Sequence, residues 1–434
     1  MTPLAAGIAG IGILLILLFF VGMPVGFSMA VVGFAGFSYI ININAGVNMA
    51  GSVFWTVCSK YGLTVIPLFI FMGQIAFYSG VNRRLYKSAY AWIGHIRGGL
   101  AMATVAACSA FSAICGSNTA TAATMSTVAI PEMNKYKYSP ILSTGAIACG
   151  STLGVVIPPS VVLIIIGLAT EQSIAKLFYG GVGAGIVLTF LLLLTVSVVC
   201  RIFPHWGPVG EKVSLKERIR SLSGGFEMIL LFLLIMAGLY FGYFTPSEAG
   251  GAGSFFALVL SLIRRTLSWN DFKNAVKDTL KVSCMVIMLV AGAMIFGKFL
   301  SVTRIPFDLA AFVSGLEISD FWIMVLISLI YIAGGAIMDA LALLLITIPI
   351  FFPLAVNMGY DPVWFAVTVT VITTLGAVTP PVGATTYVVA GIAGDIPMKD
   401  VFKGVTVFLP AYILTIFLLL VFPGIITWLP GLLR

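Results

Sequence analysis

Charged residues are scarce in this chain. Lys, Arg, Asp and Glu make up 9% of its 434 residues, 60% are apolar, and the mean hydropathy is +1.13. Globular domains carry about 25% charged residues, so the composition excludes an ordinary water-soluble domain. Several apolar runs approach or reach the roughly 20 residues that cross a bilayer: 4–21, 25–41, 182–200, 226–243 and 405–422. We therefore expect an all-α polytopic membrane protein in a lipid bilayer.

The first apolar run lacks the features of a secretory signal. No basic residue precedes residues 4–21, and no small-residue cleavage site follows them. Signal peptides have both features, so this run is predicted to be the first membrane span.

Residues that hold metals or disulfides are also few. The chain has two histidines, His95 and His205, and six cysteines without a CxxC pair. Reduced cysteines that serve packing are the expected result. The formal charge of +8 lies in short segments between apolar runs. Such charges orient spans in a bilayer, so we expect no nucleic-acid partner.

Motifs for catalysis are missing. The sequence contains no P-loop, no GxSxG and no HExxH, which are the signatures of nucleotide hydrolysis, serine hydrolases and zinc proteases. We therefore do not expect an enzyme.

The most informative stretch is TLGVVIPPS at 152–160, because it recurs as TLGAVTPPV at 374–382, 222 residues later. Each copy places a Pro-Pro pair inside a long apolar segment. Proline lacks an N–H and its ring clashes with the preceding turn, so both segments are predicted to be broken helices. In a membrane the freed carbonyls must line a protected cavity. Paired interruptions of this kind mark the binding site of secondary transporters.

Further matches extend the repeat over the whole chain. They divide it into a first repeat at 1–203, a polar connector at 204–225 and a second repeat at 226–434. Because segments rich in Gly, Ala, Ser and Thr precede basic residues, the first repeat is predicted to contain a re-entrant hairpin at about 98–130 and a broken helix at about 139–167.

The second repeat is expected to contain the same two features. Its hairpin is predicted at about 321–350 and its broken helix at about 362–392. Together with the scaffold spans, these features give each half one hairpin and one broken helix.

The charges predict that the two repeats are inverted. Segment 82–97 is basic and its counterpart 302–319 is not, whereas 264–281 is basic and its counterpart 42–60 is not. Basic loops stay cytoplasmic, so equivalent loops face opposite sides. On this topology 18 of the 23 basic residues face the cytoplasm, and the N-terminus and C-terminus are both periplasmic.

The first hairpin carries the small polar run CGSNTATAATMST at 115–127. Hydroxyl, amide and unwound carbonyl oxygens suit sodium, a hard cation. The amide groups at a half-helix N-terminus favour a carboxylate. A small-residue packing face has a similar composition, but the position before a broken helix favours the binding role.

The helix breaks add candidate ligands from the main chain. Unwinding at the prolines would free the carbonyls of Gly154, Val155, Gly376 and Val378 from their helical donors. A bound cation would satisfy these carbonyls. A kink repaired by neighbouring hydroxyls is the alternative.

Two charged residues stand out. Asp339 is the only acidic residue between Asp320 and Asp361, and its segment offers no basic partner. An intramembrane carboxylate is a functional hypothesis by default, so we expect Asp339 to ligate a cation or support its ligands. Arg304 could pair with a substrate carboxylate, or equally with Asp308 one turn further on.

At this point the motifs resemble those of the large membrane subunit of tripartite ATP-independent periplasmic (TRAP) transporters, nearly from end to end: SNTATAAT, IPEMNKYKYSP, GSTLGVVIPPS, the GGAIMDA–PIFFPLA run and TLGAVTPPVG. The resemblance implies an elevator-type fold, in which a scaffold holds a transport domain of two hairpins and two broken helices. It also implies three partners: a small four-helix (Q-type) membrane subunit, a periplasmic substrate-binding protein and a carboxylate substrate. The implied location is the bacterial inner membrane.

Together with the residues above, the resemblance implies two sets of site residues. The sodium-binding set is Ser117, Asn118, Thr119, Gly150, Gly154, Val155, Gly334, Asp339, Gly376 and Thr379. The substrate-binding set is Thr121, Ser160, Pro158, Pro159, Pro380, Pro381, Gly383 and Arg304. The second hairpin has Gly-Gly-Ala where the first has Gly-Ser-Asn, so the two cation sites are expected to be unequal.

The expected function is sodium-coupled import of an organic acid anion of the sialic acid or C4-dicarboxylate type. The alternative is an ion-translocating subunit of a membrane pumping or redox complex. Such a subunit needs chains of ionisable residues through its spans, whereas here only Asp339 lies deep in an apolar segment.

Overall fold

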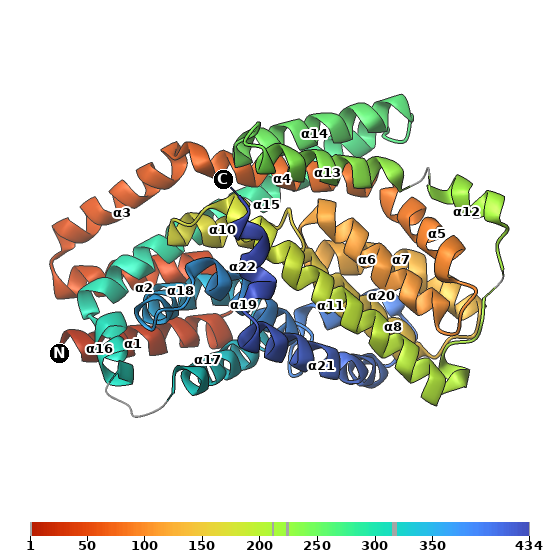
Figure 1. Cartoon of the computed structure of the whole chain (residues 1–434). Coiled ribbons are helices and arrows are strands. Elements are labelled where there is room, and N and C mark those ends of the chain that lie inside the picture. Colours follow the sequence, from red (N-terminus) through yellow and green to blue (C-terminus); the bar gives the residue numbers. More distant parts are fainter. Residues whose placement is uncertain (1, 211, 223–224, 315–318, 434) are drawn as a thin grey trace.

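The computed structural model describes residues 2–210, 212–222, 225–314 and 319–433, and these residues form helices but no strand (Figure 1). Glu317, in the segment 302–319, and Arg434 lie outside the described residues. In the described part of the chain, eight helical segments are long and apolar enough to cross a membrane. The prediction of an all-α polytopic membrane protein is confirmed.

The first half contains the following helices in chain order: α1 (Pro3–Ile16) with a π-helical end at Leu17–Val21, α2 (Val25–Ile40), α3 (Ile43–Ser59), α4 (Val65–Tyr78), α5 (Val81–Ile93), α6 (Gly99–Cys115), α7 (Asn118–Lys135), α8 (Pro140–Ser151), α9 (Leu153–Val156), α10 (Val161–Thr170) and α11 (Ile174–Ile202). A short helix, α12 (Leu215–Leu222), follows in the connector.

The second half contains a corresponding series: α13 (Phe226–Tyr240), α14 (Pro246–Ile263), α15 (Trp269–Thr303), α16 (Ile305–Ser314), α17 (Asp320–Gly335), α18 (Ala340–Asn357), α19 (Pro362–Gly376), α20 (Ala384–Ala393), α21 (Met398–Val421) and α22 (Gly424–Gly431). In each half a pair of helices joined by a short tip precedes a broken helix. For example, α7 begins at Asn118 and α18 at Ala340, 222 residues later.

Both diproline sites interrupt a helix, as the sequence predicts. In the first half α9 ends at Val156 and α10 begins at Val161, and in the second half α19 ends at Gly376 and α20 begins at Ala384. Both Pro-Pro peptide bonds are cis. The broken segments therefore lie where the repeat places them.

The hairpins extend further than predicted. Their second helices, α7 and α18, continue to Lys135 and Asn357 rather than ending near 130 and 350. The first predicted hairpin ended just before Pro131, which lies inside α7, and both Pro349 and Pro353 lie inside α18. A single proline removes one hydrogen bond and bends a helix without always ending it.

The segments interpreted as loops are largely helical, which corrects the prediction. Segment 42–60 contains α3, 82–97 contains most of α5, 264–281 contains the start of α15, and 302–319 contains α16. These helices have polar faces, so a search for continuous apolar runs passes over them. As a result, α15 is one 35-residue helix where the first half has the two helices α3 and α4.

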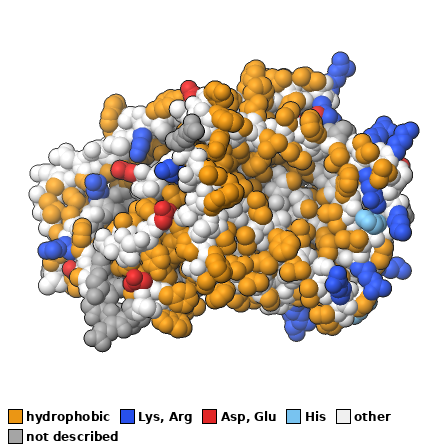
Figure 2. Space-filling view, in the orientation of Figure 1, with side chains coloured by type: hydrophobic (Ala, Val, Ile, Leu, Met, Phe, Trp, Pro, Cys, Tyr) orange, Lys and Arg blue, Asp and Glu red, His pale blue; other side chains and the backbone are white. Residues whose placement is uncertain are grey.

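The basic segments of the two halves meet at one end of the molecule. Arg264, just after α14, forms an ion pair with Glu227 at the start of α13, and Gly225 lies against Leu85 of α5. Figure 2 shows Lys and Arg side chains gathered at this end, on the right, beside a broad hydrophobic surface. The predicted topology assigns this end to the cytoplasm.

Helices α2 and α15, from different halves, pack closely because glycine lies at their crossing. A Cβ atom on Gly292 would lie 2.1 Å from the carbonyl oxygen of Gly26, and one on Gly33 would lie 2.7 Å from the backbone nitrogen of Phe296. Membrane helices associate through such small-residue contacts, since lipid supplies no hydrophobic drive between them.

We expect Gly292→Ala to lower the thermal unfolding midpoint, because the added methyl meets main chain that cannot rotate away. Overpacking of this kind destabilises by about 1–3 kcal/mol. The matched control is Gly251→Ala in α14, where a Cβ meets nothing within 4 Å. Tryptophan fluorescence of the purified proteins in detergent measures both midpoints, and equal midpoints for the two variants would contradict the packing argument.

Candidate functional site

The tip of the first hairpin docks on the first helix break. Gly116 closes α6 with a φ of 62°, and a Cβ there would lie 2.7 Å from the carbonyl oxygen of Pro159. Ser117 then caps α7, its hydroxyl accepting from the N–H of Ala120 at 3.4 Å. A Cβ on Gly154 would lie 2.8 Å from the main chain of Ser117. Glycine on both sides therefore allows the two backbones to touch.

The second half repeats this docking. A Cβ on Gly376 would lie 2.6 Å from the Cα of Gly335 at the end of α17. The N–H of Val382 donates to the carbonyl of Ala336 at 3.0 Å. Because Gly376 follows Gly154 by 222 residues, equivalent glycines serve equivalent contacts in the two halves.

Two hydrogen bonds tie the halves together near the breaks. Asn118, at the start of α7, donates from Nδ2 to Thr385 Oγ1 of α20 at 3.3 Å. The Thr152 hydroxyl lies 2.6 Å from the Tyr412 hydroxyl of α21. The first hairpin thus contacts the broken helices of both halves.

Hydroxyl groups satisfy the carbonyls at the breaks. Ser160 Oγ donates to the carbonyl of Val155 at 2.6 Å, Thr379 Oγ1 donates to that of Gly376 at 3.0 Å, and Thr386 Oγ1 donates to that of Val378 at 2.9 Å. The alternative of a kink repaired by hydroxyls is therefore observed for these three carbonyls. The Gly376 carbonyl also accepts from the N–H of Thr379 at 3.0 Å, which uses both of its lone pairs. The carbonyls of Val155 and Val378 each keep a second lone pair for a ligand.

Both hairpin tips line one cavity of about 500 Å³, which we name the central cavity. The first tip contributes residues 115–120 and the second contributes Asp339, Ala340 and Leu341. Asp339 caps α18, its carboxylate accepting from the N–H of Leu341 at 3.0 Å. The central cavity therefore has a helix N-terminus from each half in its wall.

The opposite wall of the central cavity comes from α4 and α15. Val282, Met285 and Val286 of α15 contribute apolar surface, and Ile70 and Gln74 come from α4. Sequence reasoning missed Gln74, the one amide within the otherwise apolar run of α4. A lone amide in an apolar span is a signal that could have identified it, because its polar atoms need a partner.

The structure brings five of the predicted sodium-binding residues to the lining of the central cavity: Ser117, Asn118, Thr119, Val155 and Asp339. The other predicted site residues do not line it: Gly150, Gly154, Gly334, Gly376, Thr379, Thr121, Ser160, Pro158, Pro159, Pro380, Pro381, Gly383 and Arg304.

Several of these outlying residues have structural contacts. Gly150 packs against Cys108 of α6, and the Thr121 hydroxyl donates to the carbonyl of Ser117 at 2.7 Å. Gly334 packs against Leu343 within the second hairpin. Arg304 is exposed at the junction of α15 and α16, where its φ is 62°. Gly150, Thr121 and Gly334 therefore have packing or hydrogen-bond contacts outside the cavity lining, and Arg304 lies at the surface.

Ligands for a cation at this site are oxygens. Among the described residues, no group of three or more His, Cys, Asp or Glu side chains is placed to hold a metal ion. The tips instead present hydroxyls, one amide, backbone carbonyls and the Asp339 carboxylate. Hard monovalent cations suit this donor set, and transition metals do not.

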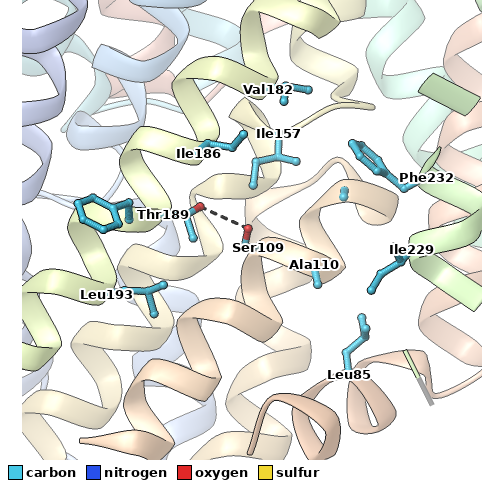
Figure 3. Close-up of a pocket in the computed structure, with 12 residues that line it drawn as sticks. Leu85, Ser109, Ala110, Ile157, Val182, Ile186, Thr189, Leu193, Ile229 and Phe232 are labelled. Carbon is cyan, nitrogen blue, oxygen red and sulfur yellow. Dashed lines mark hydrogen bonds between the residues drawn. The ribbon is translucent and has the colours of Figure 1, made fainter. Parts of the chain in front are cut away.

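A separate cavity of about 440 Å³ differs from the central cavity in the chemistry of its lining (Figure 3). Its described lining residues come mainly from α6, α11 and α13 and are apolar except for Ser109 and Thr189, whose hydroxyls lie 3.3 Å apart in a hydrogen bond. It therefore offers no charged group to an anion. The central cavity is the better candidate.

The paired hairpins and broken helices define a class of helical membrane protein with a solved example. The chain superimposes on the YdaH transporter of Alcanivorax borkumensis with a TM-score of 0.65, covering 88% of this chain and 89% of that one at 13% identity. The likeness shows the fold alone. A family model described as "Tripartite ATP-independent periplasmic transporter, DctM component" matches residues 12–429. The chain belongs to this family.

Curated relatives support the same family assignment. The C4-dicarboxylate TRAP transporter large permease protein DctM of Pseudomonas aeruginosa is 33% identical over 86% of this chain and 85% of its own length. The sialic acid TRAP transporter large permease protein SiaM of Vibrio cholerae is 31% identical over 96% of each. The resemblance found in the motifs is confirmed.

We expect Ser160→Ala to destabilise the protein by about 1–3 kcal/mol, because it leaves the buried carbonyl of Val155 without its donor. It also removes the cap that accepts from the N–H of Leu163. The matched control is Thr195→Ala in α11, whose hydroxyl donates to the carbonyl of Leu191, a group inside an unbroken helix. Thermal unfolding in detergent compares the two, and a control that loses as much stability as Ser160→Ala would refute the special role of the break.

Proposed function

We propose that this chain is the large membrane subunit of an importer that couples sodium entry to the uptake of an organic acid anion. In this proposal it acts in the bacterial inner membrane with a small four-helix membrane subunit, and a periplasmic binding protein delivers the anion. The names of the relatives support a substrate of the C4-dicarboxylate or sialic acid type. The family description, tripartite and periplasmic, supports the two protein partners.

The observation that carries the proposal is the meeting of both hairpin tips at the central cavity. Its volume of about 500 Å³ lies in the range typical of sites for small ligands. Half-helix N-termini from α7 and α18 line it. The α7 terminus, capped by the neutral Ser117 hydroxyl, favours an anion, whereas the Asp339 carboxylate already occupies that of α18. Carbonyl and carboxylate oxygens lie beside them, where cations bind.

Bound sodium ions would supply the positive charge that a carboxylate substrate needs in the central cavity. Around the first tip the oxygens of Ser117, Asn118 and Thr119 would ligate one ion, with the main chain at the first break close by. Around the second tip the Asp339 carboxylate would supply the charge that its Gly-Gly-Ala tip lacks. Bound cations would then offset the charge of the carboxylate substrate.

Charge compensation makes the movement across the membrane feasible. An isolated charge pays a large desolvation penalty at membrane depth, whereas a paired one does not. We propose that the hairpins and broken helices move as one transport domain against a scaffold that includes α4 and α15, with the two repeats in opposite orientations. The central cavity lies between these two groups of helices.

Uptake should follow the sodium gradient. In vesicles containing this chain, its small subunit and a loaded binding protein, a tenfold inward sodium gradient supplies about 1.4 kcal/mol for each ion moved, or about tenfold accumulation. Labelled succinate and N-acetylneuraminate would be tested side by side, with choline replacing sodium as the control. Uptake that ignores the gradient would end the coupling proposal.

Asp339→Asn should weaken sodium dependence without unfolding the protein. Asparagine caps helices as well as aspartate does, so only the charge at the cavity is lost. We expect the sodium concentration for half-maximal uptake to rise at least about tenfold. Asp361→Asn is the matched control, because Asp361 caps α19 in the same way and does not line the central cavity. An unchanged sodium response in Asp339→Asn would remove this residue from the site.

A further inference from the structure

A third cavity, of about 330 Å³, contains two lysines. Lys60 and Lys298 both line it, and we name it the lysine cavity. Its other walls come from α3, α10, α15 and α18, including the hydroxyl residues Thr56, Thr170 and Ser301. No Asp or Glu is among its described lining residues. It is therefore a basic cavity.

The lysine cavity and the central cavity lie along the same helices. On α15 the central cavity is lined at 282–286 and the lysine cavity at 290–301. On α18 the corresponding positions are 339–341 and 345–353. The centres of these ranges are about 9 to 12 residues apart, which is roughly 14–17 Å along a helix. The two cavities are thus successive spaces in one interface.

The other two helices show the same order. On α10 the central cavity is lined at 161–162 and the lysine cavity at 168–170. The chain that leads into α4 runs the opposite way, with the lysine cavity at 56–63 and the central cavity at 70–74. All four segments therefore place the lysine cavity towards the end opposite to Arg264 and α5.

Three buried apolar side chains occupy positions between the two cavities, and we call them the dry layer. Ile66 of α4, Ile165 of α10 and Leu344 of α18 lie between the two sets of lining positions, and each is 0% exposed. An apolar layer of this kind blocks the passage of a charged solute, because the solute would lose its hydration without a partner.

The ammonium groups are the donors that the lysine cavity offers. Within the described part of the chain, the ion pairs are Arg264 with Glu227 and Lys403 with Asp400, so neither Lys60 nor Lys298 is paired. Both lysines are exposed. The hydroxyls of Thr56, Thr170 and Ser301 donate instead to carbonyls of their own helices.

We propose that the lysine cavity is a waiting site for a carboxylate, occupied before the anion passes the dry layer into the central cavity. The proposal deepens the proposed function and rests on it. Two ammonium groups without acidic neighbours attract an anion and raise its local concentration. In this proposal the lysine cavity selects solutes by their negative charge, and the central cavity then selects them by their shape.

A structural role for the lysines makes a different prediction. Lys60 follows α3 directly and Lys298 lies near the end of α15, where cations stabilise the helix dipole. Removing a dipole contact lowers thermal stability and leaves the response to carboxylates unchanged. The two roles can therefore be separated by experiment.

Chemical labelling tests occupancy without requiring transport. Pyridoxal 5′-phosphate, an anionic aldehyde, forms an imine with a lysine amine as water leaves, and borohydride then reduces the imine to a stable amine. On the full chain in lipid nanodiscs, we expect succinate to slow labelling of Lys60 and Lys298 at least about fivefold, as read by mass spectrometry. Neutral succinamide should not protect. Exposed Lys176, outside the cavity, is the internal control.

Variants connect the site to uptake. Lys60→Gln and Lys298→Gln should each raise the KM for succinate about fivefold with little change in the maximal rate, and the double variant should raise it further. Lys298→Arg should retain the wild-type KM because the charge remains. Lys176→Gln is the matched control. Thermal unfolding of all variants identifies any dipole effect.

The outcomes separate this proposal from the proposed function. Protection of both lysines in a chain that ignores sodium would support the waiting site and refute the coupling. Sodium-driven uptake with unprotected lysines and an unchanged KM in the double variant would overturn the waiting site alone. Equal protection of Lys176 would also overturn it, because it would show screening by bulk ions.

Discussion

Unpaired backbone carbonyls at membrane depth are the constraint on which the rest of this structure depends. Each Pro-Pro pair removes two N–H donors, and lipid offers no replacement. Instead, the hydroxyls of Ser160, Thr379 and Thr386 donate to carbonyls at the breaks. Each break is also covered by the tip of a hairpin from its own half. Glycine at these contacts is required, because any Cβ would separate the two backbones.

The same architecture in the two halves carries unequal chemistry. The first tip presents Ser117 and Asn118, while the second presents the carboxylate of Asp339 beside a tip without hydroxyls. The hydrogen bond from Asn118 to Thr385 crosses between the halves. The first tip is therefore in direct contact with the second broken helix.

The interface between α4 and α15 on one side and α10 and α18 on the other holds two polar spaces with a dry layer between them. The apolar cavity in Figure 3 lies beside α6, α11 and α13 and lacks charged groups. Of these three cavities, only the two at this interface have charged lining residues.

Local sequence determined much of this protein. The apolar runs specified a helical membrane protein, the repeated Pro-Pro pairs located both breaks, and the Gly/Ser/Thr-rich run located the first tip, because these properties depend on neighbouring residues. Helices with polar faces, such as α3 and α5, were not predicted because they have no continuous apolar run. Only the tertiary structure decided which residues share a cavity. It brought Asp339 to Ser117 and Gln74 and left Arg304 outside, because contacts between residues hundreds of positions apart depend on how helices from both halves pack.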